Sequence, residues 1–253
     1  MKRQELLKVL ENKRINDDVF MIVLGSKNQL PPMLPGQFVQ VKVESGMVFL
    51  RRPFSIHDVD YAENNFSLLI QVVGEGTKAI SRVVKGSMVD VIYPLGNSFS
   101  MPVDAQKPLL IGGGVGVAPI FFMAKVLTNK GFKPDILLGF RNIKSVIKYE
   151  QFIEVGKVFV TTEDGSLGVK GYVTDHPVFN SGIYDISYCC GPEPMMRAVA
   201  GICGEKGIKC EVSLENLMGC GIGACLCCVV DTVRGNVCTC TEGPVFNINQ
   251  LKW

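Results

Sequence analysis

The stretch "KPLLIGGGVGVAPIFFMAKVLTNKG", residues 107–131, marks the point at which the character of the sequence changes. An apolar run typical of a buried strand leads into a group of glycines, and a helical pattern follows and ends at Gly131. A glycine turn between a strand and a helix lets a pyrophosphate approach backbone amides at the positive end of the helix. The stretch therefore predicts a nucleotide-binding turn, which the sequence alone does not distinguish from a tight structural turn. Its expected residues are Gly112, Gly113, Gly114, Gly116 and Pro119.

Downstream of this stretch, strand patterns alternate with helix patterns as far as residue 212. "DILLGF" (135–140), "KVFVTTEDG" (157–165) and "ISYCCGPEPMM" (186–196) continue the alternation, which is typical of a parallel sheet with helices. The last of these places Cys190, Gly191 and Pro192 where the strand ends, at the edge where parallel sheets bind ligands. We expect a partly exposed Cys190 thiol there, near a nicotinamide ring, with simple packing as the alternative.

Upstream, residues 1–102 read as β-rich. Short runs such as "FVQVKV" (38–43) and "SMVDVIY" (87–93) are separated by proline and glycine, a pattern that predicts a sandwich or barrel. "RPFS" (52–55) supplies a guanidinium for phosphate, an aromatic ring and a hydroxyl. "GEGT" (74–77) offers Gly76 and Thr77 as a second phosphate turn. Taken together on a barrel, these features suggest a flavin site.

The end of the chain, residues 213–253, is too short and too rich in glycine to form a core of its own. Within "LMGCGIGACLCCVVDT" (217–232), Cys220, Cys225 and Cys228 have the C-x4-C-x2-C spacing of plant-type [2Fe-2S] ligation. The spacing leaves Cys238 and Cys240 open as the fourth ligand. A four-cysteine zinc site is the alternative, although it usually presents two C-x2-C pairs.

Composition narrows the class of protein. The 253 residues carry a formal charge of only +2, which argues against a dedicated nucleic-acid binder. The first residues lack the apolar segment of a signal peptide, and no stretch reaches the length of a membrane span. A cytoplasmic location is therefore expected, and ten cysteines in a reducing compartment indicate metal or packing more than disulfides.

Three motifs in fixed order resemble the ferredoxin-NADP reductase superfamily: "RPFS" with "GEGT", "GGGVGVAP" with "CGPEPM", and the terminal cysteine run. The ending "CGIGACLCC…CTEGPVF" looks like the electron-transfer subunits of NAD-linked, type B dihydroorotate dehydrogenases, and this likeness extends over essentially the whole chain. The resemblance implies a β + α/β multidomain fold. Its parts are an antiparallel FAD-binding β-barrel (1–102), a parallel-sheet NAD-binding α/β domain (103–212) and a small [2Fe-2S] lobe (213–253).

The resemblance also implies site residues. It makes Cys240 the fourth ligand beside Cys220, Cys225 and Cys228, and leaves Cys238 spare. Ser55 and Cys190 would belong to the flavin and nicotinamide environment of the reaction. The flavin-binding residues that it implies are Arg52, Pro53, Phe54, Ser55, Leu69, Ile70, Gln71, Gly76 and Thr77. Relatives often carry Tyr-Arg where this chain has Ile70-Gln71, so one phosphate cation is missing.

The implied function is electron transfer. Nicotinamide exchanges two electrons as a hydride and an iron-sulfur cluster exchanges one, while flavin can do both. Electrons would pass from the FMN of a dihydroorotate dehydrogenase catalytic subunit to [2Fe-2S], to FAD and to NAD+, in pyrimidine biosynthesis. The oxidation of dihydroorotate needs a barrel of roughly 250 residues, so it must lie on another polypeptide. By resemblance, the assembly is a heterotetramer with two copies of each subunit.

Other interpretations remain open at this point. The same cofactors occur in subunits of sulfide dehydrogenases, soluble hydrogenases and bifurcating transhydrogenases, although four available cysteines favour the dihydroorotate version. A non-enzymatic module held together by zinc is an alternative of another class. Arg141 and Lys144 could pair with the 2′-phosphate of NADP, whereas Glu163 and Asp164 would repel it. Following the family, we expect NAD.

Overall fold

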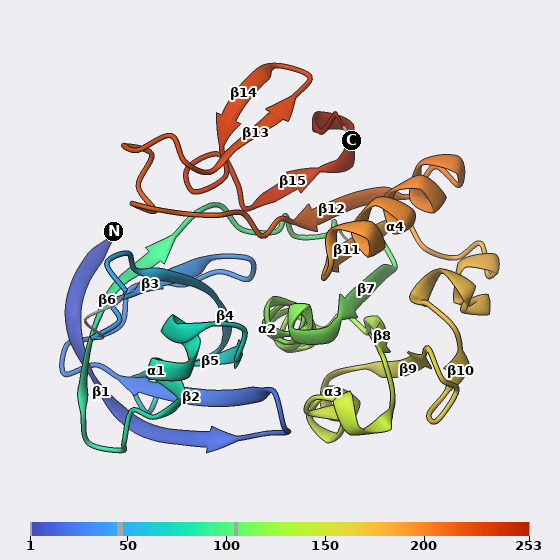
Figure 1. Ribbon diagram of the computed structural model, residues 1–253. Coiled ribbons are helices and arrows are strands. Elements are labelled where there is room, and N and C mark those ends of the chain that lie inside the picture. Colours follow the sequence, from blue (N-terminus) through green and yellow to red (C-terminus); the bar gives the residue numbers. More distant parts are fainter. Residues whose placement is uncertain (1, 45–47, 104–105, 253) are drawn as a thin grey trace.

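The computed structural model describes residues 2–44, 48–103 and 106–252. Three parts are visible in Figure 1: a β-barrel, a layer of sheet and helices beside it, and a C-terminal lobe above both. None of the helices in these described ranges is long and apolar enough to cross a membrane.

The first part is a closed six-stranded barrel in the order β1-β2-β5-β4-β3-β6, and neighbouring strands are antiparallel. Its core is filled by aliphatic and aromatic side chains that alternate along the strands, such as Val39 and Val41 on β3. The elements are β1 (Arg3–Arg14), β2 (Val19–Gly25), β3 (Phe38–Val41), β4 (Arg52–Asp60), β5 (Asn65–Gln71), α1 (Glu75–Ser81) and β6 (Met88–Leu95).

The second part is a seven-stranded sheet in the order β10-β9-β8-β7-β11-β12-β15. All neighbouring pairs are parallel except β12 and β15. The strands are β7 (Pro108–Gly113), β8 (Asp135–Phe140), β9 (Lys157–Thr162), β10 (Val169–Lys170), β11 (Ile186–Cys190), β12 (Lys209–Ser213) and β15 (Val245–Asn247). The helices are η1 (Gly114–Gly116), α2 (Val117–Asn129), η2 (Ile143–Ser145), α3 (Tyr149–Val155), η3 (Val173–Asp175), η4 (Pro177–Asn180), α4 (Glu193–Glu205) and η5 (Ile248–Gln250).

The two faces of this sheet are covered by different helices. Side chains of α2 and α3 pack on one face and those of α4 on the other, so both faces are buried and the central strands are continuously apolar. Val19 and Leu69 of the barrel belong to the same core as α2. Helix α2 therefore lies between barrel and sheet and joins them through one continuous apolar contact.

The C-terminal lobe consists of a cysteine-bearing loop and a hairpin of β13 (Val229–Thr232) and β14 (Gly235–Cys238). It packs on the barrel through a small core that contains Phe38, Leu95, Met218, Cys228 and Cys240. Strand β15 then leaves the lobe and extends the sheet of the second part. The predicted fold class is confirmed, whereas the domain boundaries remain predictions. The sequence patterns did not predict β15 or the charged strand β1.

Candidate functional site: a cysteine loop beside two glycine turns

The sulfurs of the lobe accept hydrogen bonds from the backbone of their own loop. The amides of Ile222, Ala224 and Cys225 lie 3.3–3.4 Å from the Cys220 sulfur. The Gly223 amide lies 3.2 Å from Sγ of Cys240, although the two residues are far apart in the sequence. Backbone amides that converge on sulfur stabilise thiolates, so the loop is shaped to hold negatively charged sulfur.

Glycines make this tight loop possible. Gly221 and Gly223 have φ angles of +71° and +85°, in the region that favours glycine. A Cβ on Gly223 would lie 2.8 Å from Cγ2 of Thr241, and a Cβ on Gly221 would overlap the side chain of Gln40 on β3. The loop can therefore pass this close to the barrel only with glycine at these positions.

The cysteines of the lobe differ in exposure. Cys228 and Cys240 are buried, Cys220 and Cys238 are half-buried, and Cys225 and Cys227 are exposed. Burial raises the pKa of the Cys240 thiol to about 12. At Cys220, burial acts in the same direction, but the amide donors prevail and lower the pKa to about 6.

Two pairs of the candidate ligands lie next to each other. Cys240 and Cys228 lie side by side, because the Cys240 amide is 3.4 Å from the Cys228 sulfur. The Cys220 amide makes a contact of the same length with the Cys225 sulfur. Among the described residues, no group of three or more Cys, His, Asp or Glu side chains is arranged to hold a single metal ion.

The two predicted glycine turns of the α/β domain lie against each other. A Cβ on Gly116 would lie 2.6 Å from the Cα of Gly191, and a Cβ on Gly113 would lie 2.4 Å from the sulfur of Met195. Strand β7 therefore ends in a turn that fits against the turn after β11 only because both lack side chains. Pro119 is buried in the first turn of α2. Backbone N–H groups in a first turn have no partner within the helix, so proline loses no hydrogen bond there.

The expectation of a partly exposed Cys190 is wrong. The side chain is 1% exposed, because it lies in the core beneath α2 at the end of β11. This burial raises the pKa of the thiol above its usual range, so Cys190 is a neutral thiol at physiological pH. Its role beside a nicotinamide ring remains a prediction.

The two neighbouring arginines of the barrel motif have different partners. Arg51 forms a partly buried ion pair with Asp90, with 2.7 Å between Nη2 and Oδ2. Arg52 contacts backbone carbonyls and has no carboxylate partner among the described residues. Its guanidinium lies beside Gly76, where a Cβ would be 3.0 Å from Nε. The structure thus brings together the arginine and the glycine turn that the sequence assigned to phosphate.

The glycine turn at residues 74–77 begins helix α1, whose first amides have no partner within the helix. The Thr77 hydroxyl is used inside this turn, because it donates to the Gly74 carbonyl and accepts from the amides of Val73 and Gly74. For an anion, the structure therefore offers backbone amides beside Arg52, while Thr77 holds the turn in shape.

Strand β5 is open beside the flavin motif. In the described residues, the pairing of β4 with β5 extends from Ile56 opposite Leu68 to Asp60 opposite Asn65. Leu69–Gln71 of β5 therefore have no partner on β4. Leu69 faces the junction with the α/β domain, and Gln71 is exposed. The Ile70 side chain lies in the barrel core, so only its backbone remains for a flavin contact.

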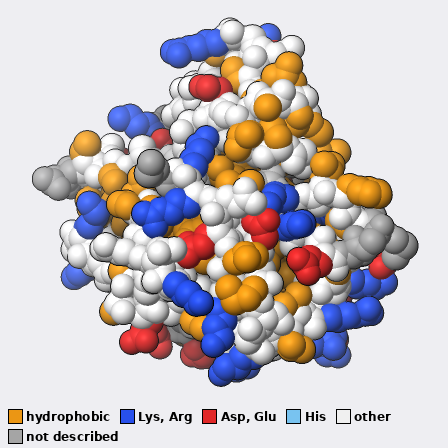
Figure 2. All heavy atoms as spheres, turned by 90° about the vertical axis from the view of Figure 1, so that its left-hand side faces the viewer, with side chains coloured by type: hydrophobic (Ala, Val, Ile, Leu, Met, Phe, Trp, Pro, Cys, Tyr) orange, Lys and Arg blue, Asp and Glu red, His pale blue; other side chains and the backbone are white. Residues whose placement is uncertain are grey.

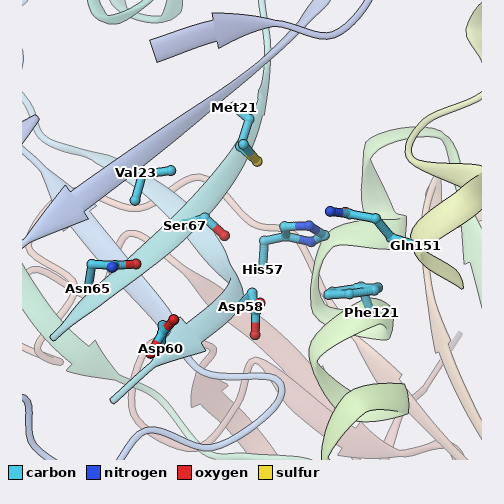
Figure 3. Close-up of a pocket in the computed structure, with 9 residues that line it drawn as sticks. All are labelled: Met21, Val23, His57, Asp58, Asp60, Asn65, Ser67, Phe121 and Gln151. Atoms are coloured by element: carbon cyan, nitrogen blue, oxygen red, sulfur yellow. The ribbon is translucent and has the colours of Figure 1, made fainter. Parts of the chain in front are cut away.

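A pocket of about 190 Å³ lies at the junction of the barrel with α2 and α3 (Figure 3) and contains none of the predicted site residues. His57 stands at its inner end, with Nδ1 3.3 Å from the Ala118 carbonyl and its ring centroid 4.7 Å from that of Phe121. Burial lowers the pKa of His57 to about 4, so the ring is neutral. Asp58, on the rim, pairs with Lys125 of α2 at 2.7 Å.

The surface around the cysteine loop is apolar. Leu217, Ile222 and Leu226 are more than half exposed, at 81%, 52% and 65%. Figure 2 shows hydrophobic side chains gathered over the upper part of the molecule, where the lobe lies. Because an apolar patch rimmed by polar residues marks an interaction site, this surface is a candidate interface.

Sequence reasoning missed the residues on which the lobe rests. Phe38 and Gln40 lie on the face of β3 opposite to Val39 and Val41, and both are covered by the lobe. The alternation in "FVQVKV" puts Phe38 and Gln40 on one face. A strand pattern does not predict what covers that face, so a glutamine at this position would be predicted to be exposed.

The comparisons with known proteins agree with this geometry. Residues 215–252 match the model of the iron-sulfur cluster binding domain of dihydroorotate dehydrogenase B. The "Dihydroorotate dehydrogenase B (NAD(+)), electron transfer subunit" of Bacillus cereus strain ATCC 14579 is 41% identical over 99% of both chains. That of strain G9842 is 40% identical, also over 99% of both chains.

Solved structures show the same fold. The NADH-dependent reduced ferredoxin-NADP oxidoreductase, studied for flavin-based electron bifurcation, has a TM-score of 0.89 and 31% identity over 98% of this chain and 90% of its own. The FAD/NAD-binding domain of a nitric oxide dioxygenase from Vibrio cholerae has a TM-score of 0.69 at 17% identity, over 82% of this chain and 97% of its own. The second likeness shows the fold alone.

Barrel, doubly covered sheet and cysteine lobe together define an oxidoreductase subunit of the ferredoxin reductase-like class. Within this class, the chain belongs to the family of dihydroorotate dehydrogenase B electron transfer subunits.

Proposed function

We propose that this chain passes electrons from the FMN of a dihydroorotate-oxidising subunit through [2Fe-2S] and FAD to NAD+, in the synthesis of pyrimidines. The observation that carries the proposal is a match of 41% identity to such a subunit across 99% of the chain. The overall reaction balances as dihydroorotate + NAD+ giving orotate + NADH + H+. Dihydroorotate loses two electrons on the partner, and NAD+ gains them as a hydride.

Each cofactor has its own proposed residues. The cluster would be held by Cys220, Cys225, Cys228 and Cys240, whose sulfurs the loop supplies with amide donors. NAD+ would lie on the paired turns formed by Gly112, Gly113, Gly114, Gly116, Pro119, Cys190, Gly191 and Pro192. FAD would be held by Arg52, Pro53, Phe54, Ser55, Leu69, Ile70, Gln71, Gly76 and Thr77.

The chain's own residues bind and orient these groups. Flavin supplies the change from two-electron to one-electron transfer. Arg52 and the first amides of α1 supply positive charge for the phosphates. The paired glycine turns would place a nucleotide at the sheet edge next to the barrel. Leu69, which shares a core with α2, would help to exclude water from the junction. Only electrons would cross the cluster, so NAD+ + 2e− + H+ gives NADH on this chain with one proton taken up from solvent at the flavin site, while the oxidation on the partner releases two protons.

The partner is an FMN-containing dihydroorotate dehydrogenase catalytic subunit, in a heterotetramer of two plus two. Its docking surface is the apolar patch of Leu217, Ile222 and Leu226 around the cysteine loop. Docking there would cover the exposed side of the cluster ligands and shorten the path for electrons. A cytoplasmic location belongs to the same proposal.

A second function is favoured by one observation. The reduced ferredoxin-NADP oxidoreductase matches 98% of this chain with a TM-score of 0.89. The same cofactor order would then serve an NAD(P)H-oxidising subunit of a bifurcating enzyme. The lower identity of 31%, against 41% for the dihydroorotate family, places this candidate second.

Anaerobic spectroscopy of the purified chain tests both functions. We expect one FAD and two iron and two sulfide ions per chain, no zinc, and bleaching on addition of NADH. Mixed with a dihydroorotate-oxidising FMN subunit, the chain should reduce NAD+ when dihydroorotate is added. A colourless zinc protein would contradict both functions, and NADH-dependent ferredoxin reduction without dihydroorotate coupling would favour the second.

A further inference from the structure

Gln40 is a buried polar residue without a partner. It lies on β3 and is 0% exposed, and neither Nε2 nor Oε1 forms a hydrogen bond within the described residues. A buried amide group that loses its hydrogen bonds to water costs roughly 1–3 kcal/mol. A side chain of this kind therefore indicates a polar partner in the working protein.

The direction in which Gln40 points is fixed by the strand. Val39 and Val41 face the barrel core, so Gln40 and Phe38 face the opposite way, toward the C-terminal lobe. On that side lies the cysteine loop. A Cβ on Gly221 would lie 2.7 Å from Cγ and 2.9 Å from Nε2 of Gln40. The amide end of Gln40 is thus pressed against the residue that follows Cys220.

The same residue borders the proposed flavin site. In the pairing of β3 with β4, Gln40 lies opposite Pro53, inside the "RPFS" motif. One residue therefore touches the cysteine loop with its side chain and the flavin motif with its backbone. It lies between the cysteine loop and the proposed flavin motif.

We propose that the carboxamide of Gln40 donates a hydrogen bond to a sulfur of the bound cluster or of its thiolate ligands, and thereby raises the reduction potential of the cluster. The inference rests on the proposed function. A reduced cluster carries one more negative charge than an oxidised one, and a hydrogen bond to sulfur stabilises that charge. Gln40 thus favours the arrival of electrons on the cluster.

The test is an EPR-monitored potentiometric titration of the full chain with its FAD, in the wild type and in Gln40→Met. Methionine keeps the length of the side chain but cannot donate. We expect unchanged iron and sulfide content and a tenfold lower equilibrium constant for reduction, which is about 59 mV more negative for one electron. Gln40→His keeps an N–H donor and should lie closer to the wild type.

Gln37→Met is the matched control. Gln37 precedes the same strand, but both ends of its carboxamide have partners, since Nε2 donates to the Gly96 carbonyl and Oε1 accepts from the Leu34 amide. This variant should lose stability and keep the potential. Should Gln40→Met not assemble a cluster, Gln40→Leu, which is also apolar and cannot donate, replaces it, and a lower potential is again expected.

The outcomes separate the two proposals. An unchanged potential in a cluster-containing Gln40→Met or Gln40→Leu variant overturns the role of Gln40 and leaves the proposed function intact. A wild-type protein without iron and sulfide overturns the proposed function itself. Pulsed EPR of the reduced cluster in deuterated buffer gives a direct reading: the loop amides contribute exchangeable protons in both proteins, and one further exchangeable-proton coupling should be present in the wild type and lost in Gln40→Met.

Discussion

Cys238 and Cys240 are two positions apart, yet they differ in their surroundings. Cys240 is fully buried, and its sulfur accepts the Gly223 amide of the cysteine loop, whereas Cys238 is half-buried at the end of β14. We predict that Cys240→Ser loses the cluster, because serine removes a thiolate that the loop is built around. Iron and sulfide analysis of the purified variant measures this.

Cys238→Ser and Cys227→Ser serve as controls and should each retain two iron and two sulfide ions. Within the described residues, backbone amides donate to the sulfurs of the four proposed ligands but none donates to the Cys227 sulfur, so its loss should leave the cluster in place. Loss of iron from Cys238→Ser together with retention in Cys240→Ser would reverse the assignment of the fourth ligand.

Arg51 and Arg52 allow a matched pair of substitutions. Arg52→Ala should weaken FAD binding roughly tenfold or more, because a hydrogen bond to a charged group contributes about 1.5–3 kcal/mol. The measurement is FAD stoichiometry after gel filtration, followed by titration of the apoprotein with FAD. Arg51→Ala breaks the Asp90 ion pair instead, and should lower the free energy of unfolding while FAD stays bound. Equal FAD affinity in Arg52→Ala and the wild type would remove Arg52 from the flavin site.

At the scale of elements, the two glycine turns act as a unit. A Cβ on Gly116 would lie 2.6–2.7 Å from backbone atoms of Gly191 and Cys190, and backbone cannot rotate away. We predict that Gly116→Ala forces the turns apart. It should lower the free energy of unfolding by about 1–3 kcal/mol and weaken NADH binding, as measured by urea unfolding and NADH titration.

Gly131→Ala, beyond the other end of α2, separates these effects. Gly131 has a φ of +87° and open space around it, so alanine there strains the backbone without any clash. This variant should lower the free energy of unfolding by about 1–2 kcal/mol and leave the affinity for NADH unchanged. A Gly116→Ala variant that binds NADH normally would show that the contact between the turns is structural only.

At the scale of the whole molecule, His57 couples barrel and α/β domain. Its pKa is lowered by burial to about 4, whereas an unfolded chain has about 6.5. The unfolded state therefore binds more protons between these values, and stability falls as the pH falls through this window. We predict that protonation linked to His57 lowers the free energy of unfolding by about 2 kcal/mol between pH 7 and pH 5.

Urea unfolding of wild type and His57→Gln at pH 5, 6 and 7 tests this, because glutamine cannot be protonated and should flatten the dependence. His176→Gln is the control, since His176 is only partly buried and lies outside the junction of barrel and α/β domain; burial lowers its pKa as well. Parallel pH curves for the wild type and His57→Gln would show that His57 is not the coupling group.

The sequence by itself determined the order of the parts and most of the chemistry. Glycines between apolar strand and helix patterns, and the C-x4-C-x2-C spacing, are local signals, because a tight turn needs glycine wherever it occurs. The barrel, the parallel sheet and the cysteine loop were predictable for this reason. The charged strand β1 was not, because its alternation of polar and apolar residues gains meaning only beside β2 and β6.

Tertiary structure alone decided which side chains are covered and what they meet. Cys190 is the last residue of β11 and yet is buried, since α2 lies over it. Arg51 and Arg52 are adjacent and yet only Arg51 meets a carboxylate within the described residues. Gln40 reads as an exposed position of an alternating strand, but the lobe covers it and leaves its amide against the cysteine loop. Burial depends on elements far away in the sequence, so no local pattern contains it.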